Sequence, residues 1–206
     1  FGYYYSSKRE HDLRKGYIFA GIADFLDNIY NIHNYAFYSQ YTKSISQNLK
    51  LITSIRIDKN ETEQILIYDK YTGNPSNYIV SPHAIVNDDN LLSGSFKIKY
   101  TFNENITFIS SLKRGFKTSG INQSQELYIN DNNRIYNKEI CYNLDIAMIV
   151  RNKKYNLKIN SFYMHRKRPQ LRLSYQYDIN NPNAFDFATF NASFGYNYGL
   201  ESDLIL

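Results

Sequence analysis

The four histidines are the side chains in this sequence that are best suited to metal binding or acid–base chemistry. They are His11, His33, His83 and His165. No histidine has a second histidine, a cysteine or a carboxylate pair at the spacing that metal ligands need. Surface or rim positions are the simplest interpretation, and contact with a haem or a metal-bearing solute stays open for His11 and His83.

Cys141 is the only cysteine, so the chain can form neither an internal disulfide nor a cysteine-based zinc site. A cysteine nucleophile needs a histidine and an acid brought to it, and no motif around Cys141 supplies them. A buried or lipid-facing small residue is the expected role. We therefore predict a protein that is not an enzyme, with no catalytic residue, no metal site and no cofactor, and with ligand-contacting residues that no motif identifies.

Cationic side chains are the remaining candidates for binding. The one dense basic run is His165-Arg166-Lys167-Arg168, in a chain whose net charge is +5 over 206 residues. This balance gives no reason to expect a nucleic-acid partner. The run predicts contact with an anionic solute, a solvated strand extension, or a strand end that pairs with lipopolysaccharide phosphates.

Other cations share the parity of one polar face: Lys50, Arg56, Lys97, Lys99, Lys113 and Lys158. Contact of that face with water explains them, and guidance of an anionic solute is the sharper alternative.

Strands must position these side chains, because apolar and polar residues alternate with period two. In residues 104–122, Ile106, Phe108 and Leu112 fall on one side. Arg114 has the parity of that apolar side, and Gly115 could mark a bulge that redirects it. We predict eight antiparallel strands, at 1–7, 33–45, 49–58, 95–102, 106–117, 138–151, 155–177 and 187–206.

Short and long connections alternate along the chain. Short turns are expected near 46–48, 103–105 and 152–154, and long loops at 8–32, 59–90, 118–136 and 178–186. A short helix near 20–29 and a strand extension over 64–71 are allowed within the loops. This alternation is typical of outer-membrane barrels, with short turns on the periplasmic side and long loops outside. The sequence contains no run of eighteen apolar residues, so we predict no membrane-spanning helix.

Five segments resemble, in order, the barrel of TonB-dependent outer-membrane receptors. The run from Arg114 to Asn122 resembles the strand end Arg-Gly-aromatic-Lys-small-Gly-Gly-Phe-Asn of that family. The other segments are 34–40, 49–58, 155–163 and 198–201. Thr118, Ser119 and Ile121 depart from the family pattern, as does Ser54, which stands where glycine is common.

This resemblance implies an all-β fold, an antiparallel transmembrane β-barrel of which the chain is a partial wall of about eight long strands. Residues 1–206 would be part of one barrel domain, without the plug, the N-terminal region and the final strand. The implied function is TonB-energised uptake of a ferric siderophore across the outer membrane of a Gram-negative bacterium. The implied partners are TonB, the solute, and outer-membrane lipid and lipopolysaccharide.

Two alternatives remain open. A soluble or surface all-β binding module would also alternate, although its strands are usually shorter. A passive outer-membrane porin would lack a plug.

Overall fold

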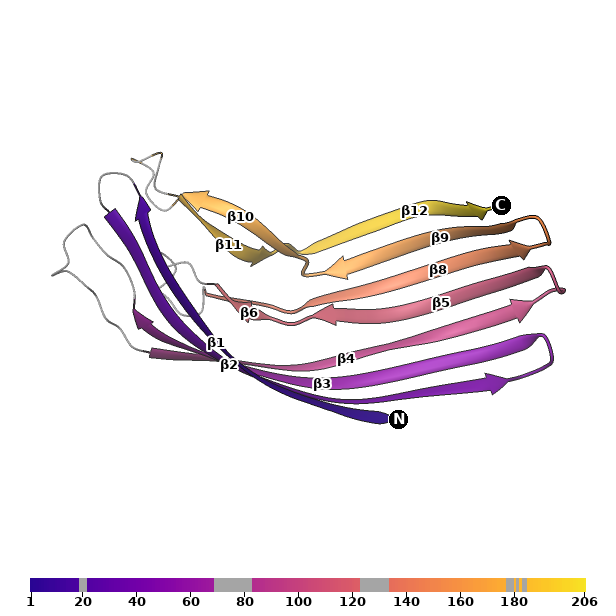
Figure 1. Ribbon diagram of the computed structural model, residues 1–206, viewed down its shortest axis with the longest axis horizontal. Coiled ribbons are helices and arrows are strands. Elements are labelled where there is room, and N and C mark those ends of the chain that lie inside the picture. Colours follow the sequence, from indigo (N-terminus) through magenta and orange to yellow (C-terminus); the bar gives the residue numbers. More distant parts are fainter. Residues whose placement is uncertain (19–21, 69–82, 123–133, 177–179, 181, 183–184) are drawn as a thin grey trace.

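The computed structural model is one broad, curved, antiparallel sheet with two small sheets at the end opposite the short turns (Figure 1). It describes residues 1–18, 22–68, 83–122, 134–176, 180, 182 and 185–206. In that part of the chain, no helix is long and apolar enough to cross a membrane.

Eight strands make up the main sheet, in the order β1-β2-β3-β4-β5-β8-β9-β12. Their bounds are Gly2–Ile18 (β1), Ile22–Ser44 (β2), Leu49–Tyr68 (β3), His83–Thr101 (β4), Ile106–Lys117 (β5), Glu139–Arg151 (β8), Asn156–Lys167 (β9) and Phe194–Ile205 (β12). The small sheets pair β6 (Gly120–Ile121) with β7 (Ile135–Tyr136), and β10 (Gln170–Gln176) with β11 (Phe185–Asn191). The antiparallel all-β fold is confirmed, and the main sheet does not close on itself.

Three tight turns join the strands at one end, as the sequence predicts. The main chain closes each turn with N–H···O bonds of 2.8 Å from Ile45 to Leu49, 2.9 Å from Phe102 to Ile106 and 2.9 Å from Asn152 to Tyr155. The Asn103 side chain accepts two further main-chain bonds, which is the local pairing that favours asparagine in turns.

The predicted loop at 8–32 is wrong, and so is the helix near 20–29. β1 and β2 pair without a break from Gly2 opposite Tyr38 to Ile18 opposite Ile22, so this stretch is a long hairpin. His11 Nε2 lies 2.7 Å from Asp27 Oδ1 across it. Polar residues occupy both faces of these strands here, so the sequence shows no alternation of apolar and polar residues. The backbone pairing nevertheless continues.

The predicted loop at 59–90 is also mostly strand. β3 continues to Tyr68, which confirms a strand extension, and it pairs with β4 as far as Leu66 opposite His83. Residues 69–82 lie outside the described part. In the predicted loop 118–136, the short strands β6 and β7 appear, and residues 123–133 lie outside the description.

The predicted strands 155–177 and 187–206 are each interrupted. β9 ends at Lys167, Arg168 has a positive φ of 55°, and Pro169 follows, which has no N–H to continue the ladder. The chain then forms the separate hairpin of β10 and β11. Two main-chain bonds, Arg168 to Ser193 (3.2 Å) and Ala192 to Pro169 (3.0 Å), hold the two breaks side by side.

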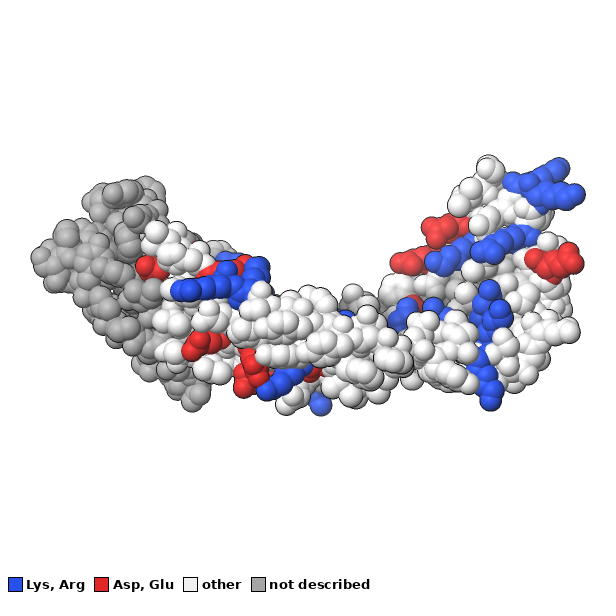
Figure 2. Space-filling view, turned by 60° about the horizontal axis from the view of Figure 1, so that its bottom comes forward, with Lys and Arg blue, Asp and Glu red and all other residues white. Residues whose placement is uncertain are grey.

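The two faces of the main sheet differ in chemistry. One face, here called the apolar face, includes a row in register across six strands: Thr53, Phe96, Leu112, Leu144, Tyr163 and Tyr198. The aromatic and leucine side chains of this row are exposed, with Leu112 at 56% and Tyr198 at 72%. The opposite face, here called the polar face, carries most of the charged side chains of the central rows, among them Lys97, Lys99, Lys113, Asp145 and Arg166. Figure 2 shows Lys, Arg, Asp and Glu gathered toward the ends of the molecule, with a mostly uncharged surface between.

Candidate functional site

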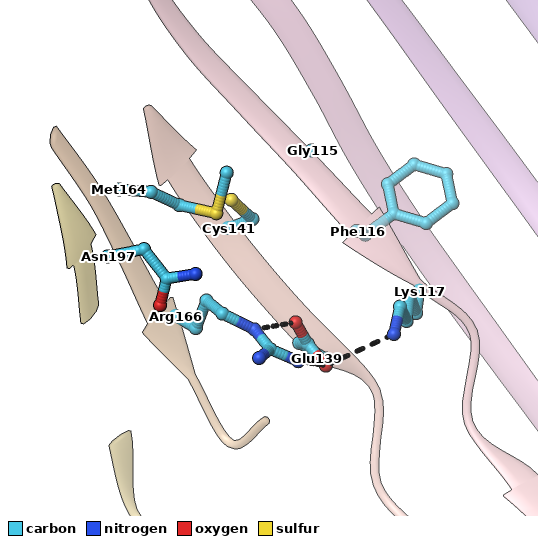
Figure 3. Close-up of a pocket in the computed structure, with 8 residues that line it drawn as sticks. All are labelled: Gly115, Phe116, Lys117, Glu139, Cys141, Met164, Arg166 and Asn197. Atoms are coloured by element: carbon cyan, nitrogen blue, oxygen red, sulfur yellow. Dashed lines mark hydrogen bonds and ion pairs between the residues drawn. The ribbon is translucent and has the colours of Figure 1, made fainter. Parts of the chain in front are cut away.

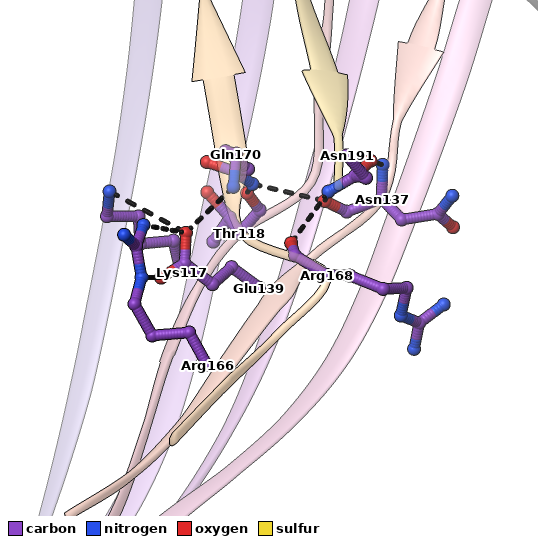
Figure 4. Close-up of polar contacts among 8 residues, drawn as sticks. All are labelled: Lys117, Thr118, Asn137, Glu139, Arg166, Arg168, Gln170 and Asn191. Carbon is purple, nitrogen blue, oxygen red and sulfur yellow. Dashed lines mark hydrogen bonds and ion pairs between the residues drawn. The ribbon is translucent and has the colours of Figure 1, made fainter. Parts of the chain in front are cut away.

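Glu139, the first residue of β8, is the centre of the polar cluster at the loop end of the polar face (Figure 4). Arg166 on β9 donates from Nε to Oε1 at 2.6 Å and from Nη2 to Oε2 at 2.9 Å. The Gln170 main-chain N–H donates to Oε2 at 2.9 Å, and Lys117 Nζ lies 3.8 Å away. Glu139 is only 3% exposed. A buried carboxylate needs this degree of pairing, so the cluster fixes β5, β8, β9 and the start of β10 together.

An open hollow of about 470 Å³ lies beside this cluster (Figure 3). It is lined by Gly115, Phe116, Lys117, Glu139, Cys141, Met164, Arg166 and Asn197. One side is charged and the other is formed by the sulfur-bearing side chains of Cys141 and Met164. The hollow can therefore accept a solute with both polar and soft apolar groups. It cannot use Cys141 as a nucleophile with His165, because the alternation of β9 puts His165 on the apolar face.

Amide side chains hold the β10–β11 hairpin against its neighbours. Gln170 Nε2 donates to the carbonyl oxygens of Thr118 (2.7 Å) and Asn137 (3.1 Å). Asn191 Nδ2 donates to the carbonyls of Asn137 and Arg168, each at 2.9 Å. Figure 4 shows these contacts converging where the strands of the main sheet end. Side chains thus replace the main-chain ladder at this junction.

A second buried network joins β4 to the segment after β5. Asp89 Oδ2 accepts hydrogen bonds from the main-chain N–H (2.7 Å) and the hydroxyl (2.5 Å) of Ser119. Asn87 Nδ2 donates to the same hydroxyl oxygen, and Lys138 Nζ lies 3.5 Å from Asp89 Oδ1. This network bridges the place where the pairing of β4 with β5 ends, at Gly94 opposite Arg114.

The long hairpins contribute a third polar group to the same end. Gln64 Nε2 donates to Asn28 Oδ1 (3.0 Å) and to the Tyr30 hydroxyl (3.1 Å), while Gln64 Oε1 accepts from Arg134 Nη2 at 2.9 Å. Arg134 and Asn28 are fully buried. Buried amides and guanidinium groups need such partners, so this contact orders the segment around Arg134 against β2 and β3.

The basic run at 165–168 does not form one patch. Arg166 lies on the polar face with Glu139, Arg168 forms the bend before β10, and His165 and Lys167 lie on the apolar face. Arg114 shares the apolar face, because β5 and β8 stay in register through Gly115 and Phe116. The predicted bulge at Gly115 is therefore wrong.

The predicted polar-face cations divide into paired and unpaired groups. Lys113 Nζ lies 2.8 Å from Asp145 Oδ2, and Arg56 makes a two-bond contact with Asp58. Lys50 lies opposite Lys99 near the short turns, with Lys97 one row away. Among the described residues these last three lysines form no ion pair.

The histidines are spread over the molecule, as their sequence positions suggest. His11 contacts Asp27, His33 lines a groove with Glu61 and Glu63, and the side chain of His83 lies outside the described part. No group of three or more His, Cys, Asp or Glu side chains that could hold a metal ion occurs among the residues described.

The sequence did not identify Glu139, Asp89, Ser119 or Arg134 as site residues. Glu139 and Cys141 are two residues apart on one strand, so the alternation of side chains already placed both of them on the polar face. The contact between Asp89 and Ser119 joins residues thirty positions apart, and no local pattern indicates it.

Comparisons with known proteins agree with this architecture. The family described as "TonB dependent receptor-like, beta-barrel" matches residues 1–205. The ferric yersiniabactin uptake receptor FyuA from Yersinia pestis is similar in structure, with a TM-score of 0.76 and 16% identity over 98% of this chain and 28% of that chain. The copper transporter OprC is similar with a TM-score of 0.66 and 13% identity over 89% of this chain and 32% of that chain.

The chain thus spans about a third, or less, of the length of these two solved structures. No curated protein sequence matches it. At these identities the solved structures show the fold alone, whereas the family match covers nearly every residue. The chain belongs to the TonB-dependent receptor family, as part of its β-barrel.

Proposed function

We propose that this chain forms part of the wall of a TonB-energised importer in the outer membrane of a Gram-negative bacterium, and that the imported solute is a ferric siderophore. The observation that carries the proposal is the family match over residues 1–205, together with a sheet that is apolar on one face and charged on the other. Members of this family are transporters and not enzymes.

The apolar face suits contact with lipid. Leu112, Tyr163 and Tyr198 are large and exposed, and exposure on this scale favours a membrane environment over water. Strands that alternate in this way, with aromatic side chains near the interfaces, are typical of outer-membrane barrels. Outer-membrane lipid and lipopolysaccharide are therefore proposed partners of this face.

The polar face suits a water-filled lumen that an anionic iron complex crosses. Lys50, Lys97 and Lys99 lie on this face without described ion-pair partners, so they supply uncompensated positive charge. Such charge raises the local concentration of an anionic solute. FyuA is an uptake receptor for a ferric complex and OprC is a copper transporter, so a metal-bearing solute is the cargo class that we propose, with a ferric siderophore first among such solutes.

TonB itself would act through parts of the receptor other than these 206 residues. Residues 1–206 supply wall, loops and lumen, and they carry out no covalent step. The plug domain that the resemblance implies would fill the lumen and move when TonB pulls on it.

The test is uptake of radioactive iron by the full-length receptor, expressed in a strain without siderophore receptors of its own. Cells would be offered a panel of ferric siderophores in the presence and absence of TonB. Accumulation that requires TonB supports the proposal. Accumulation without TonB would instead indicate a passive porin, and binding without accumulation would indicate a surface binding module.

A further inference from the structure

The apolar face carries a small group of basic side chains at its loop end. On β5, β8, β9 and β12, the residues of this face include Arg114, His165 and Lys167. The other positions of the same face on these strands are apolar, aromatic or serine, and none of them is Asp or Glu. The positive charge on this part of the lipid-facing surface is therefore confined to one end and has no acidic neighbour.

Arg114 is held but not neutralised. Its guanidinium carbon lies 5.9 Å from the centre of the Tyr142 ring, which stabilises a cation but leaves its charge in place. Its Nη1 is buried without a hydrogen-bond partner. None of Arg114, His165 and Lys167 forms an ion pair with a described residue.

The three basic side chains lie close enough to contact one bound group. In the sheet register, Arg114 lies opposite Tyr142, and Tyr142 lies opposite His165, with Lys167 two residues further along β9. Adjacent strands are about 4.8 Å apart, so β5 and β9 are about 10 Å apart. Arginine and lysine side chains can bend along an apolar surface to close such a gap.

From this arrangement we infer that Arg114, His165 and Lys167 form a binding site for the phosphate group of a lipid in the outer leaflet. This inference rests on the proposed membrane location of the apolar face. A planar guanidinium matches a phosphate with two parallel hydrogen bonds, and Lys167 is exposed to add a third donor. An imported solute does not reach this site, because the site lies on the face opposite Glu139 and Cys141.

Aromatic side chains surround Arg114, His165 and Lys167. Tyr142, Tyr196 and Phe194 are 42%, 58% and 64% exposed on the same face. Amphipathic rings are favoured at the boundary between hydrocarbon and polar headgroups. The site thus lies where the phosphates of a lipid layer would be found.

The test uses the full-length receptor, purified in detergent and freed of lipid. Binding of lipid A would be compared with binding of the same lipid after removal of its phosphates. The variant Arg114→Gln/Lys167→Gln removes two positive charges from the apolar face, and Lys50→Gln/Lys99→Gln removes two from the polar face as a matched control. Migration on unheated gels checks that each variant keeps a folded barrel.

We expect the apolar-face variant to lose about tenfold or more in affinity for lipid A, since charge-assisted hydrogen bonds are removed, and the control to keep its affinity. Added salt should also weaken the binding of lipid A to the unaltered receptor. Equal affinity for the two lipids, or equal loss in the two variants, overturns the inference.

The lipid-binding test and the uptake test can fail independently of each other. A receptor that imports iron with TonB but shows no preference for phosphorylated lipid contradicts only the lipid site. A receptor that prefers phosphorylated lipid but imports nothing contradicts only the transport proposal.

Discussion

The guanidinium of Arg166 and the carboxylate of Glu139 face each other from adjacent strands, with both of their hydrogen bonds formed at 2.6 and 2.9 Å. The pair lies just before β9 ends and the chain bends away at Arg168. The Gln170 N–H, which follows the bend, donates to the same carboxylate. One buried acid therefore fixes the direction in which the β10–β11 hairpin leaves the sheet.

Arg166→Ala should lower the free energy of unfolding of the full-length receptor by about 3 kcal/mol, because it leaves Glu139 buried without its main partner. Denaturant titration in micelles measures the change. Arg151→Ala is the control, since Arg151 is exposed and forms no ion pair with a described residue. Equal losses in the two variants would show that the Glu139 pair does not stabilise the barrel.

Asp89→Ala should loosen the segment around Ser119 without unfolding the spanning strands. It removes two hydrogen bonds from Ser119 and the contact with Lys138, at a cost of about 2 kcal/mol. Hydrogen exchange at residues 118–122 and 134–138 should accelerate. Asp88→Ala, at the exposed neighbouring position, is the control, and the same acceleration in both variants would contradict this assignment.

Gly94→Ala should destabilise the sheet where β4 leaves β5. A methyl group at Gly94 would lie 2.5 Å from the Ser54 carbonyl oxygen, so the backbone must shift, at a cost of about 1–3 kcal/mol. Gly115→Ala is the matched control, because a methyl group there meets nothing within 4 Å. Thermal unfolding would compare the two variants. A Gly94→Ala receptor as stable as the unaltered one would contradict the close approach of β4 to Ser54 on β3.

Replacing Lys50, Lys97 and Lys99 together with glutamine should reduce iron uptake at low ionic strength by about tenfold, because steering of an anionic solute is lost. The difference should shrink as salt is added. Lys153→Gln/Lys154→Gln, in an exposed turn, is the control. Uptake that is unchanged in the triple variant would mean that these lysines do not guide the solute.

The central part of the main sheet could be predicted from the sequence, because each strand there carries apolar side chains on one face and polar side chains on the other. Residues such as Phe108, Leu112 and Lys113 therefore alternate, and the turn at 103–105 was predicted correctly. The strands around His11, Glu61 and Asp88 continue into polar surroundings. There the backbone hydrogen bonds persist without an apolar pattern to reveal them.

The polar clusters were less predictable because they depend on contacts between distant segments. The pairing of Gln64 with Arg134 joins residues seventy positions apart. The basic run at 165–168 illustrates the opposite difficulty, since four neighbours in sequence are distributed by strand alternation and a bend. Only the register shows that Lys167 belongs with Arg114 and that Arg166 belongs with Glu139.

The end of β4–β5 pairing at Gly94 and Arg114 has a consequence for solubility during assembly. Beyond Gly94, no described strand pairs with that side of β4, and an open strand edge can pair with another protein chain and aggregate. Lys138 Nζ donates to the Asn90 carbonyl oxygen at 2.8 Å, and Ser119 is bonded to Asp89 on the same strand. These contacts cover the exposed edge, so we expect the segment after β5 to oppose pairing of this edge with another protein chain.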